Sequence, residues 1–312
     1  MDERALPATR SPSETRTRIL KHKYLYILLL PAVIHYIIFA YLPIYGITLA
    51  FQEFSYRRGI LGSPWVGFKH FETLFAFRGF WQVFNNTVVI SVVKLITSFP
   101  VPIIIAVMLN EVRGSLSRRF YQTVYTFPHF LSWVIVSGII FNFLSTDGVL
   151  NQTLVALGGD RVNLLTRINA FRPLLYVTNI WKSAGWGSII YLAAIAGINP
   201  ELYEAASIDG ANRYRKMLHI TWPGIRSTAG ILFILSVANI MNAGFDQIFN
   251  LYNPVVYDVA DILDTYIYRR ALMMGMDFSS ATAIGLFKSV INFILLIGAN
   301  LFVRVLGEEG VF

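Results

Sequence analysis

Long uninterrupted runs of apolar residues most limit what this chain can fold into. Six runs can be read, each close to the roughly 20 residues that a helix needs to cross a bilayer. They cover residues 24–51, 87–109, 120–143, 174–198, 228–249 and 283–305. Because lipid cannot satisfy exposed backbone groups, each run is expected to be helical. The predicted fold is therefore an all-α membrane protein with six transmembrane helices.

Composition agrees with a membrane protein. The chain is 55% hydrophobic and 14% charged, whereas soluble domains carry about 25% charged residues. There is no cysteine, so disulfides and thiolate metal sites are excluded. The net charge of +8 could suggest a nucleic-acid partner. The charges, however, lie between and at the ends of the apolar runs, which is the pattern of membrane topology, and no nucleic-acid partner is expected.

The distribution of Lys and Arg predicts the orientation. Arg113, Arg118 and Arg119 lie in one short connection, and such clusters favour the cytoplasmic side. With six helices, both termini then lie in the cytoplasm, in a bacterial plasma (inner) membrane. The predicted organisation is a disordered cytoplasmic tail (1–23), a transmembrane domain (24–306) containing a cytoplasmic loop (199–223), and a cytoplasmic C-terminus (307–312). No internal repeat is evident.

Recognisable catalytic patterns are absent from the sequence. It contains no glycine-rich phosphate loop ending in Gly-Lys-Ser/Thr. Its five histidines lack zinc-ligand spacing, and Gly-Trp-Gly-Ser at 185–188 is not a nucleophile elbow. We therefore expect a chain that is not an enzyme and holds no metal.

The segment Glu204–Pro223 is a polar island between two apolar runs. Asn199 before Pro200 predicts a helix start. Gly210 allows a change of direction, and a basic second helix is expected to end at 222–224 (Trp-Pro-Gly). Two short helices around a glycine indicate a docking surface rather than a simple turn.

This segment closely resembles the EAA loop of ATP-binding-cassette (ABC) importer permeases. Its matching positions are Glu204, Ala205, Ala206, Asp209, Gly210, Ala211, Ile220 and Pro223. The visible departure is Met217, where that family usually has Phe. The resemblance implies a type I importer permease in which Glu204 makes a charged contact with an ATPase, Gly210 makes the turn, and Ala205, Ala206 and Met217 pack.

Other segments extend the resemblance over about residues 24–306. Residues 65–71 (Trp-Val-Gly-Phe-Lys-His-Phe) and Asn86-Thr87 look like segments of sugar permeases of the maltose type. Residues 99–102 (Phe-Pro-Val-Pro) and 109–111 (Leu-Asn-Glu) are similar to the LplB-like branch, which imports complex oligosaccharides and polysaccharide fragments. Permeases for alginate and for pectin-derived uronates fall within that branch.

The resemblance also implies the partners and the mechanism. The expected complex holds a second homologous permease in a heterodimer, two ABC ATPases and an extracytoplasmic solute-binding protein that delivers the sugar. This chain would hold no cofactor, because ATP and Mg²⁺ would be bound by the ATPases. Alternating access would follow from ATPase closure acting through the loop.

Polar residues within the apolar runs are the candidates for a substrate pathway, since each is costly against lipid. Asn179, Lys182, Ser183 and Trp186 follow i, i+3, i+4 and i+7 spacing and share one helix face. The resemblance places substrate contacts at Asn179, Trp186, Ser236 and Asn239. The alternative for each residue is a helix–helix hydrogen bond or, for Trp, an interfacial anchor.

Three lysines within the runs raise the question of an acidic substrate. Lys94, Lys182 and Lys288 face essentially one acid, Asp246. An anionic glycan would be favoured in such a path. A carboxylate from a second permease subunit would explain the same excess, and both interpretations remain open.

Two other classes compete with an ABC permease. An ATP-independent secondary transporter or channel explains six helices with polar faces, but it leaves the spacing of Glu204–Pro223 as coincidence. A membrane enzyme acting on lipid-linked sugars would need paired acids, for which Asp258, Asp261 and Asp264 are the candidates. Their spacing of three looks more like a solvated helix face.

Overall fold

The structure is a computed structural model that describes residues 21–311 except 274, 276 and 309. Within those residues the chain is helical, and its one extended pairing is an isolated bridge between Gln52 and Trp65. The all-α prediction is therefore confirmed. Residues 1–20 of the predicted disordered tail lie outside the described residues.

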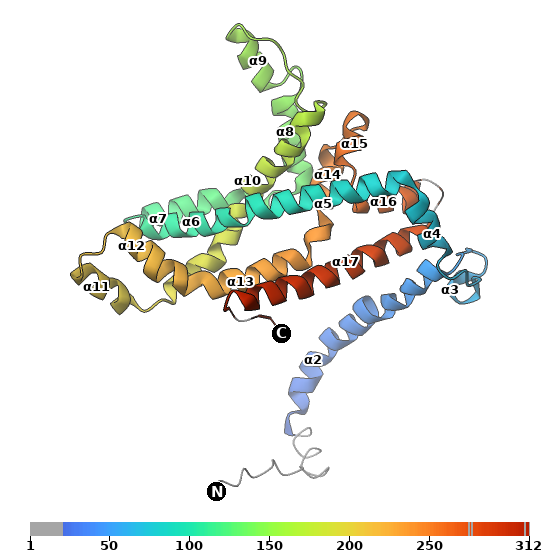
Figure 1. Ribbon diagram of the computed structural model, residues 1–312, viewed down its shortest axis with the longest axis horizontal. Coiled ribbons are helices and arrows are strands. Elements are labelled where there is room, and N and C mark those ends of the chain that lie inside the picture. The colour runs from blue at the N-terminus through green and yellow to red at the C-terminus, as the bar shows by residue number, and fades with distance from the viewer. Residues whose placement is uncertain (1–20, 274, 276, 309, 312) are drawn as a thin grey trace.

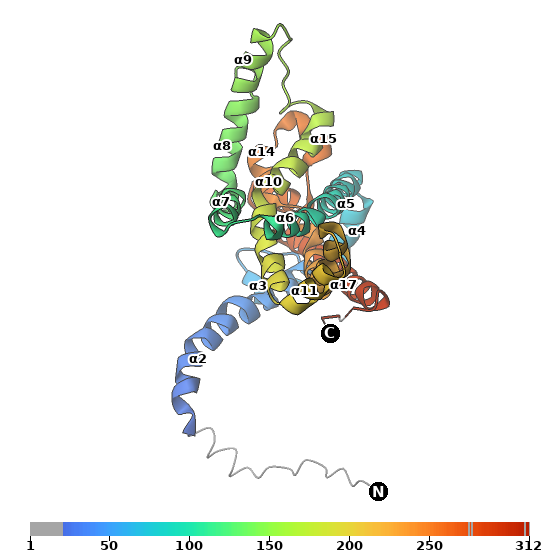
Figure 2. The same ribbon diagram turned by 90° about the vertical axis from the view of Figure 1, so that its left-hand side faces the viewer.

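The first apolar run forms a helical segment that leaves the rest of the molecule. It consists of α2 (Lys23–Tyr36), a π-helical turn (Ile37–Tyr41) and a 3-10 segment (Leu42–Phe51). Residues 23–45 are exposed, and only the 3-10 segment packs against the last helix, α17 (Phe278–Val305). In Figures 1 and 2, α2 points away from all other helices. Its apolar side chains therefore need lipid or another protein around them.

The body is built from long helices that span most of its length (Figure 1). α5 (Arg78–Ser98) and α6 (Pro100–Glu111) follow one another with a junction at Pro100, where the proline cannot donate a backbone hydrogen bond. α10 (Ile168–Ala196) packs on both of them, and α13 (Trp222–Ala238) packs on α17. The contacts of α10 contribute to apolar clusters around Ile90 and Ile225, and α13 and α17 share a cluster around Ile234.

Two expected helices are interrupted. Run 120–143 is wrong as a single helix: α7 (Ser115–Thr126) ends in a 3-10 turn at Phe127–Phe130, and α8 (Trp133–Leu144) begins after Leu131, whose backbone is extended. Pro128 opens this interruption, and the Ser132 hydroxyl caps α8 by accepting from the Ile135 N–H. Run 228–249 is likewise split into α13 and α14 (Phe245–Leu251).

Five described segments are long and apolar enough to cross a membrane: Lys23–Phe51, Arg78–Glu111, Trp133–Ala156, Arg213–Ala238 and Phe278–Val305. The third includes α9 (Val149–Ala156), which with α8 forms an arm projecting from the body in both views. α10 has 29 residues but is not among the five, because polar residues such as Asn179, Lys182 and Ser183 interrupt its apolar character. The count of six stays a prediction.

Asn86 and Thr87 of α5 hold the connecting segment at residues 258–263 by hydrogen bonds. The Asn86 amide donates to the carbonyls of Asp258 (3.0 Å) and Asp261 (3.1 Å), and Thr87 Oγ1 accepts from the Leu263 N–H (2.9 Å). Arg172 of α10 donates to Asn86 Oδ1 at 2.8 Å. The segment carrying α15 (Tyr257–Ala260) and α16 (Leu263–Tyr268) is thereby held on α5 and α10.

The remaining short elements connect the long helices. After the first run, α3 (Gly59–Gly62) and α4 (Lys69–Ala76) form a loop whose Phe68 and Phe71 rings contact Phe51. The other connecting elements are α11 (Pro200–Ile208), α12 (Arg213–Lys216), η4 (Met217–Thr221), η5 (Ile240–Asn242), η6 (Pro254–Val256) and η7 (Arg269–Met273).

Candidate functional site

A break between α13 and α14 contains the one non-glycine residue with a positive φ in the described part of the chain. α13 stops at Ala238, and after η5 both Ala243 (φ 47°) and Gly244 (φ 90°) have left-handed conformations. A left-handed conformation costs a residue with a Cβ about 1–2 kcal/mol, so surrounding contacts must hold Ala243 there. The break turns backbone carbonyls out of the helical ladder, where they need other donors.

Lys94 of α5 supplies such a donor. Its Nζ donates to the Ala243 carbonyl at 2.6 Å and to Gln247 Oε1 at 2.5 Å. The Gln247 amide in turn donates to the Leu175 carbonyl and to Thr178 Oγ1, both at 2.8 Å. α5, α10 and α14 are thus tied together through one buried network, in which Lys94 is only 9% exposed.

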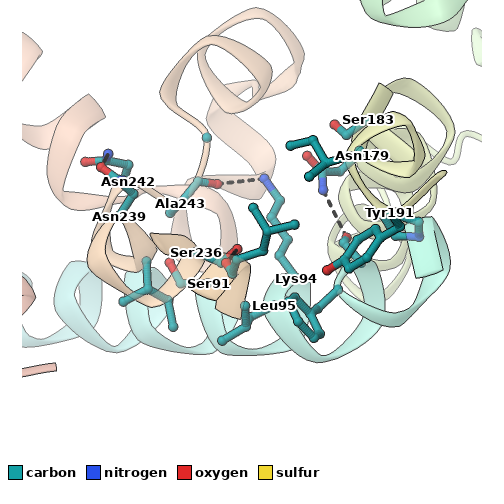
Figure 3. Close-up of a pocket in the computed structure, with 18 residues that line it drawn as sticks. Ser91, Lys94, Leu95, Asn179, Ser183, Tyr191, Ser236, Asn239, Asn242 and Ala243 are labelled. Atoms are coloured by element: carbon teal, nitrogen blue, oxygen red, sulfur yellow. Dashed lines mark hydrogen bonds between the residues drawn. The ribbon is translucent and has the colours of Figure 1, made fainter. Parts of the chain in front are cut away.

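A cavity of about 390 Å³ lies beside this network (Figure 3). It is open on one side and is lined by residues of α5, α6, α10, α13 and the break. Its polar lining residues are Ser91, Lys94, Ser98, Asn179, Ser183, Tyr191, Ser236, Asn239 and Asn242. Hydroxyl and amide groups above an apolar wall suit a polyhydroxylated ligand, and the volume falls within the range of small-molecule pockets.

Four of the residues singled out from the sequence meet at this cavity. Asn179 and Ser183 come from α10, whereas Ser236 and Asn239 come from α13 and its end. The Asn179 amide donates to Ser98 Oγ at 3.0 Å, which links α10 to the end of α5. Their role in substrate passage remains a prediction, but they do form one polar surface.

Lys182 and Trp186 do not line the cavity. The Lys182 Nζ donates to the His129 carbonyl at 2.8 Å and lies 5.6 Å from the centre of the Trp133 ring. The Trp186 ring stacks on the His129 ring with centroids 4.6 Å apart. The i, i+3, i+4, i+7 stripe is broad enough that one edge faces the cavity while the other faces the α7–α8 junction.

Five polar lining residues were not predicted as site residues from the sequence: Ser91, Lys94, Ser98, Tyr191 and Asn242. The central position of Lys94 in an apolar run was the available signal. Ser91 gives no such signal, because single serines are common in membrane helices. Asn242 was visible in the sequence as a polar residue of the same apolar run as Ser236 and Asn239.

The segment Glu204–Pro223 forms the predicted pair of helices around a glycine. α11 starts with the Asn199 side chain accepting from the Glu201 N–H, and α12 starts with Asn212 accepting from the Arg215 N–H. Gly210 between them has φ 73°, a conformation that glycine adopts without steric cost.

The predicted end of the second helix at 222–224 is wrong. α12 runs through the π-helical turn η4 directly into α13, whose first turn contains Pro223. A proline is tolerated in the first turn of a helix, and the π turn widens the ladder where Pro223 could not have donated. The loop is therefore continuous with a long helix that ends at the cavity.

The surface of this loop is partly apolar. Glu204, Ala205, Asp209 and Gly210 are exposed, whereas Ala206, Ala211 and Met217 are half-buried. Two residues outside the motif are the most exposed apolar side chains here, at 87% for Ile208 and 72% for Tyr214. Exposed apolar side chains within a charged surface indicate a protein interface.

The acids Asp258, Asp261 and Asp264 do not form a solvated helix face. Asp261 is buried and pairs with Arg269, one of whose nitrogens lies 2.8 Å from Asp261 Oδ1. Asp264 pairs with Lys288 at 2.5 Å. Across the described part of the chain, no cluster of His, Cys, Asp or Glu could hold a metal ion. Of the three lysines within the apolar runs, Lys288 is therefore paired, and only Lys94 and Lys182 have no acidic partner among the described residues.

Comparisons with known proteins identify the family of the chain. Residues 98–307 match the family model described as binding-protein-dependent transport system inner membrane component. A polygalacturonan/rhamnogalacturonan transport system permease protein, YteP of Bacillus subtilis (strain 168), is 44% identical over 99% of this chain and 97% of its own length. Protein LplB of the same organism is 42% identical, over 94% and 92%.

A solved structure is also similar. It is the crystal structure of a bacterial alginate ABC transporter in complex with an alginate pentasaccharide-bound periplasmic protein. One of its chains superimposes with a TM-score of 0.86 at 40% identity, covering 95% of this chain and 99% of that one.

Proposed function

This chain belongs to the inner membrane components of binding-protein-dependent transport systems, and within an ABC importer we propose that it forms part of a path for acidic oligosaccharides. Membership confirms the resemblance to LplB-like permeases. The chain is a non-catalytic membrane subunit of a carbohydrate importer, and an ATP-independent secondary transporter is not favoured.

The observation that carries the acidic part of the proposal is the uncompensated lysine charge. Lys94 and Lys182 both lie within long helices, and their contacts in the described chain are to neutral acceptors. A buried charge is normally paired. The descriptions of the similar proteins name polygalacturonan and alginate. Both are polymers of uronic acids and would supply the missing carboxylates.

We assign the substrate pathway to two regions. Asn179, Ser183, Ser236 and Asn239 would contact sugar hydroxyls from the cavity wall. Lys182 and Trp186 would act on the neighbouring face toward α7 and α8, where the half-exposed Trp186 ring could stack on a sugar.

The coupling surface is assigned to the loop 199–223 of the transmembrane domain 24–306. Glu204, Ala205, Asp209 and Gly210 would face a cytoplasmic ATPase, while Ala206, Ala211 and Met217 would support them from below. Both termini, including residues 307–312, would share that side of the plasma membrane. A second permease, two ATPases holding ATP and Mg²⁺, and a solute-binding protein would complete the importer.

Reconstitution tests this function directly. This chain would be co-purified with its second permease and ATPases, placed in proteoliposomes, and supplied with binding protein loaded with trigalacturonate. ATP-dependent uptake that exceeds uptake of the carboxyl-reduced trisaccharide is expected. Uptake without ATP would restore the secondary-transporter alternative, and equal uptake of both sugars would remove the acidic part of the proposal.

A further inference from the structure

The part of the cavity beside the helix break carries a lysine, whereas the other polar side chains that line the cavity are neutral. We propose that Lys94 and Ser91 form a subsite for the carboxylate of an acidic sugar, so that Lys94 sets the preference for acidic over neutral glycans. This inference rests on the proposed function and names the residues that would carry its selectivity.

One N–H group of the Lys94 ammonium has no acceptor among the described residues. Of its three N–H groups, two are accounted for by the Ala243 carbonyl and Gln247 Oε1. Both acceptors are neutral, and no described carboxylate forms an ion pair with Lys94. A ligand carboxylate would therefore meet both a donor and an uncompensated charge.

Ser91 provides the second, independent observation. It lies three residues before Lys94, one turn away on the same face of α5, and lines the same cavity (Figure 3). Ser91 is only 4% exposed, and its hydroxyl has no hydrogen-bond partner among the described residues. Buried polar groups are almost always paired, so this hydroxyl points to a partner that arrives with the ligand.

The backbone break keeps the subsite in place. A Cβ at Gly244 would lie 2.7 Å from Lys94 Nζ, so a larger residue there would displace the ammonium. The hydrogen bond that Lys94 donates to Gln247 Oε1 fixes the direction of the lysine side chain, because the Gln247 amide is itself anchored to Leu175 and Thr178. The charge is thus held ready before a ligand binds, which lowers the entropic cost of binding.

Lys94 differs from the other polar residues of the cavity because its side chain is charged. Ser183, Asn179, Ser236, Asn239 and Asn242 are neutral and can bind the hydroxyls of any sugar. A hydrogen bond between ions is roughly twice as strong as one between neutral groups. A neutral glycan would leave the positive charge of Lys94 without a counter-charge. The site would therefore bind a neutral glycan more weakly than an acidic one.

The test uses the complete reconstituted importer with one binding protein for all variants. The probes are trigalacturonate and its carboxyl-reduced counterpart, and the readout is the ratio of their ATP-dependent uptake. Because the binding protein is constant, any change in the ratio arises in the permease. Lys94→Met is expected to lower the ratio about tenfold or more, whereas Lys94→Arg should retain most of it.

Two further variants make the result unambiguous. Asn239→Asp keeps the size of an exposed cavity residue but adds a competing negative charge, and should lower the ratio without requiring the core to repack. Lys69→Met is the control, since Lys69 is exposed, pairs with Glu53 and lies outside the cavity. Its ratio should equal that of the wild type.

The outcomes separate this inference from the proposed function. A wild-type ratio near one would remove the acidic importer itself. A wild type that favours the acid, together with an unchanged ratio in Lys94→Met, would overturn the Lys94 subsite alone, as would loss of preference in Lys182→Met only. If Lys94→Met fails to assemble, an unchanged ratio in Asn239→Asp overturns the inference.

Discussion

Gly185 shows how much depends on single residues where membrane helices cross. It lies where α10 packs on α7, and a Cβ at this position would overlap the carbonyl oxygen of Tyr125. Lipid tails are as apolar as the protein interior, so close backbone approach through small residues is a main source of helix association. The atoms that a Cβ at residue 185 would meet belong to the backbone of α7, which cannot rotate away as a side chain can.

We predict that Gly185→Ala forces α10 and α7 apart and destabilises the chain by about 1–3 kcal/mol, the usual cost of overpacking. Gly138→Ala in α8 is the matched control, because its Cβ would meet no atom within 4 Å. Thermal unfolding of the purified complex in detergent measures both variants. Equal midpoints for the two would show that this crossing does not limit stability.

Ion pairs within the apolar region hold whole elements together. Asp264 of α16 and Lys288 of α17 are 2.5 Å apart, with side chains 21% and 13% exposed. Removing one partner of a buried pair leaves an isolated charge, which costs about 3–5 kcal/mol, whereas removing both is often nearly neutral. This pair therefore favours one arrangement of α16 on α17 over displaced ones.

Lys288→Met alone is expected to lower the unfolding midpoint of the detergent-solubilised complex clearly. The double variant Asp264→Asn with Lys288→Met should recover most of the loss, because neither charge is then left unpaired. Additive losses in the double variant would mean that the two side chains act independently. Uptake by the double variant, compared with the wild type, reports whether the pair has a role beyond stability.

At the scale of the whole molecule, one helical segment joins the loop 199–223 to the cavity. Residues Arg213–Ala238 form 26 continuous helical residues, which at 1.5 Å each span about 39 Å. One end carries α12 beside Gly210, and the other ends next to Asn239. A rigid element of this kind can convert loop displacement into a change at the cavity, provided that the ATPase binds the loop differently in the two states.

Gly210→Pro is predicted to abolish transport and ATPase co-purification while leaving membrane insertion intact. Proline holds φ near −65° and cannot adopt the 73° found here, so α11 and α12 would be reoriented. Gly210→Ala is the milder control, because its Cβ meets open space and only the positive φ opposes it, at about 1–2 kcal/mol. Normal transport in the proline variant would contradict coupling through this turn.

Glu204→Lys tests the same coupling without altering the turn. It reverses an exposed charge on α11 and should reduce ATPase recovery in a pull-down from solubilised membranes. Glu201→Gln on the same helix serves as the control. Recovery equal to that of the wild type would remove Glu204 from the docking surface.

The sequence by itself determined that this is a helical membrane protein with a two-helix loop around Gly210. Hydrophobic runs and helix caps are local signals, because transfer into lipid and the first turn of a helix depend on residues close in the chain. Local patterns also placed Asn179 and Ser183 on one face of a helix. They could not show where that face ends, so Lys182 and Trp186 were grouped with them.

Only the tertiary structure decided which polar groups meet. Lys94 and the Ala243 carbonyl are 149 residues apart, and the bond between them requires α13 to break where the sequence suggests a continuous helix. In a membrane the outside of a helix is as apolar as its packed side, so hydropathy alone does not reveal which neighbour a helix faces. The cavity and its charged corner therefore exist only through the packing of α5, α10 and α13.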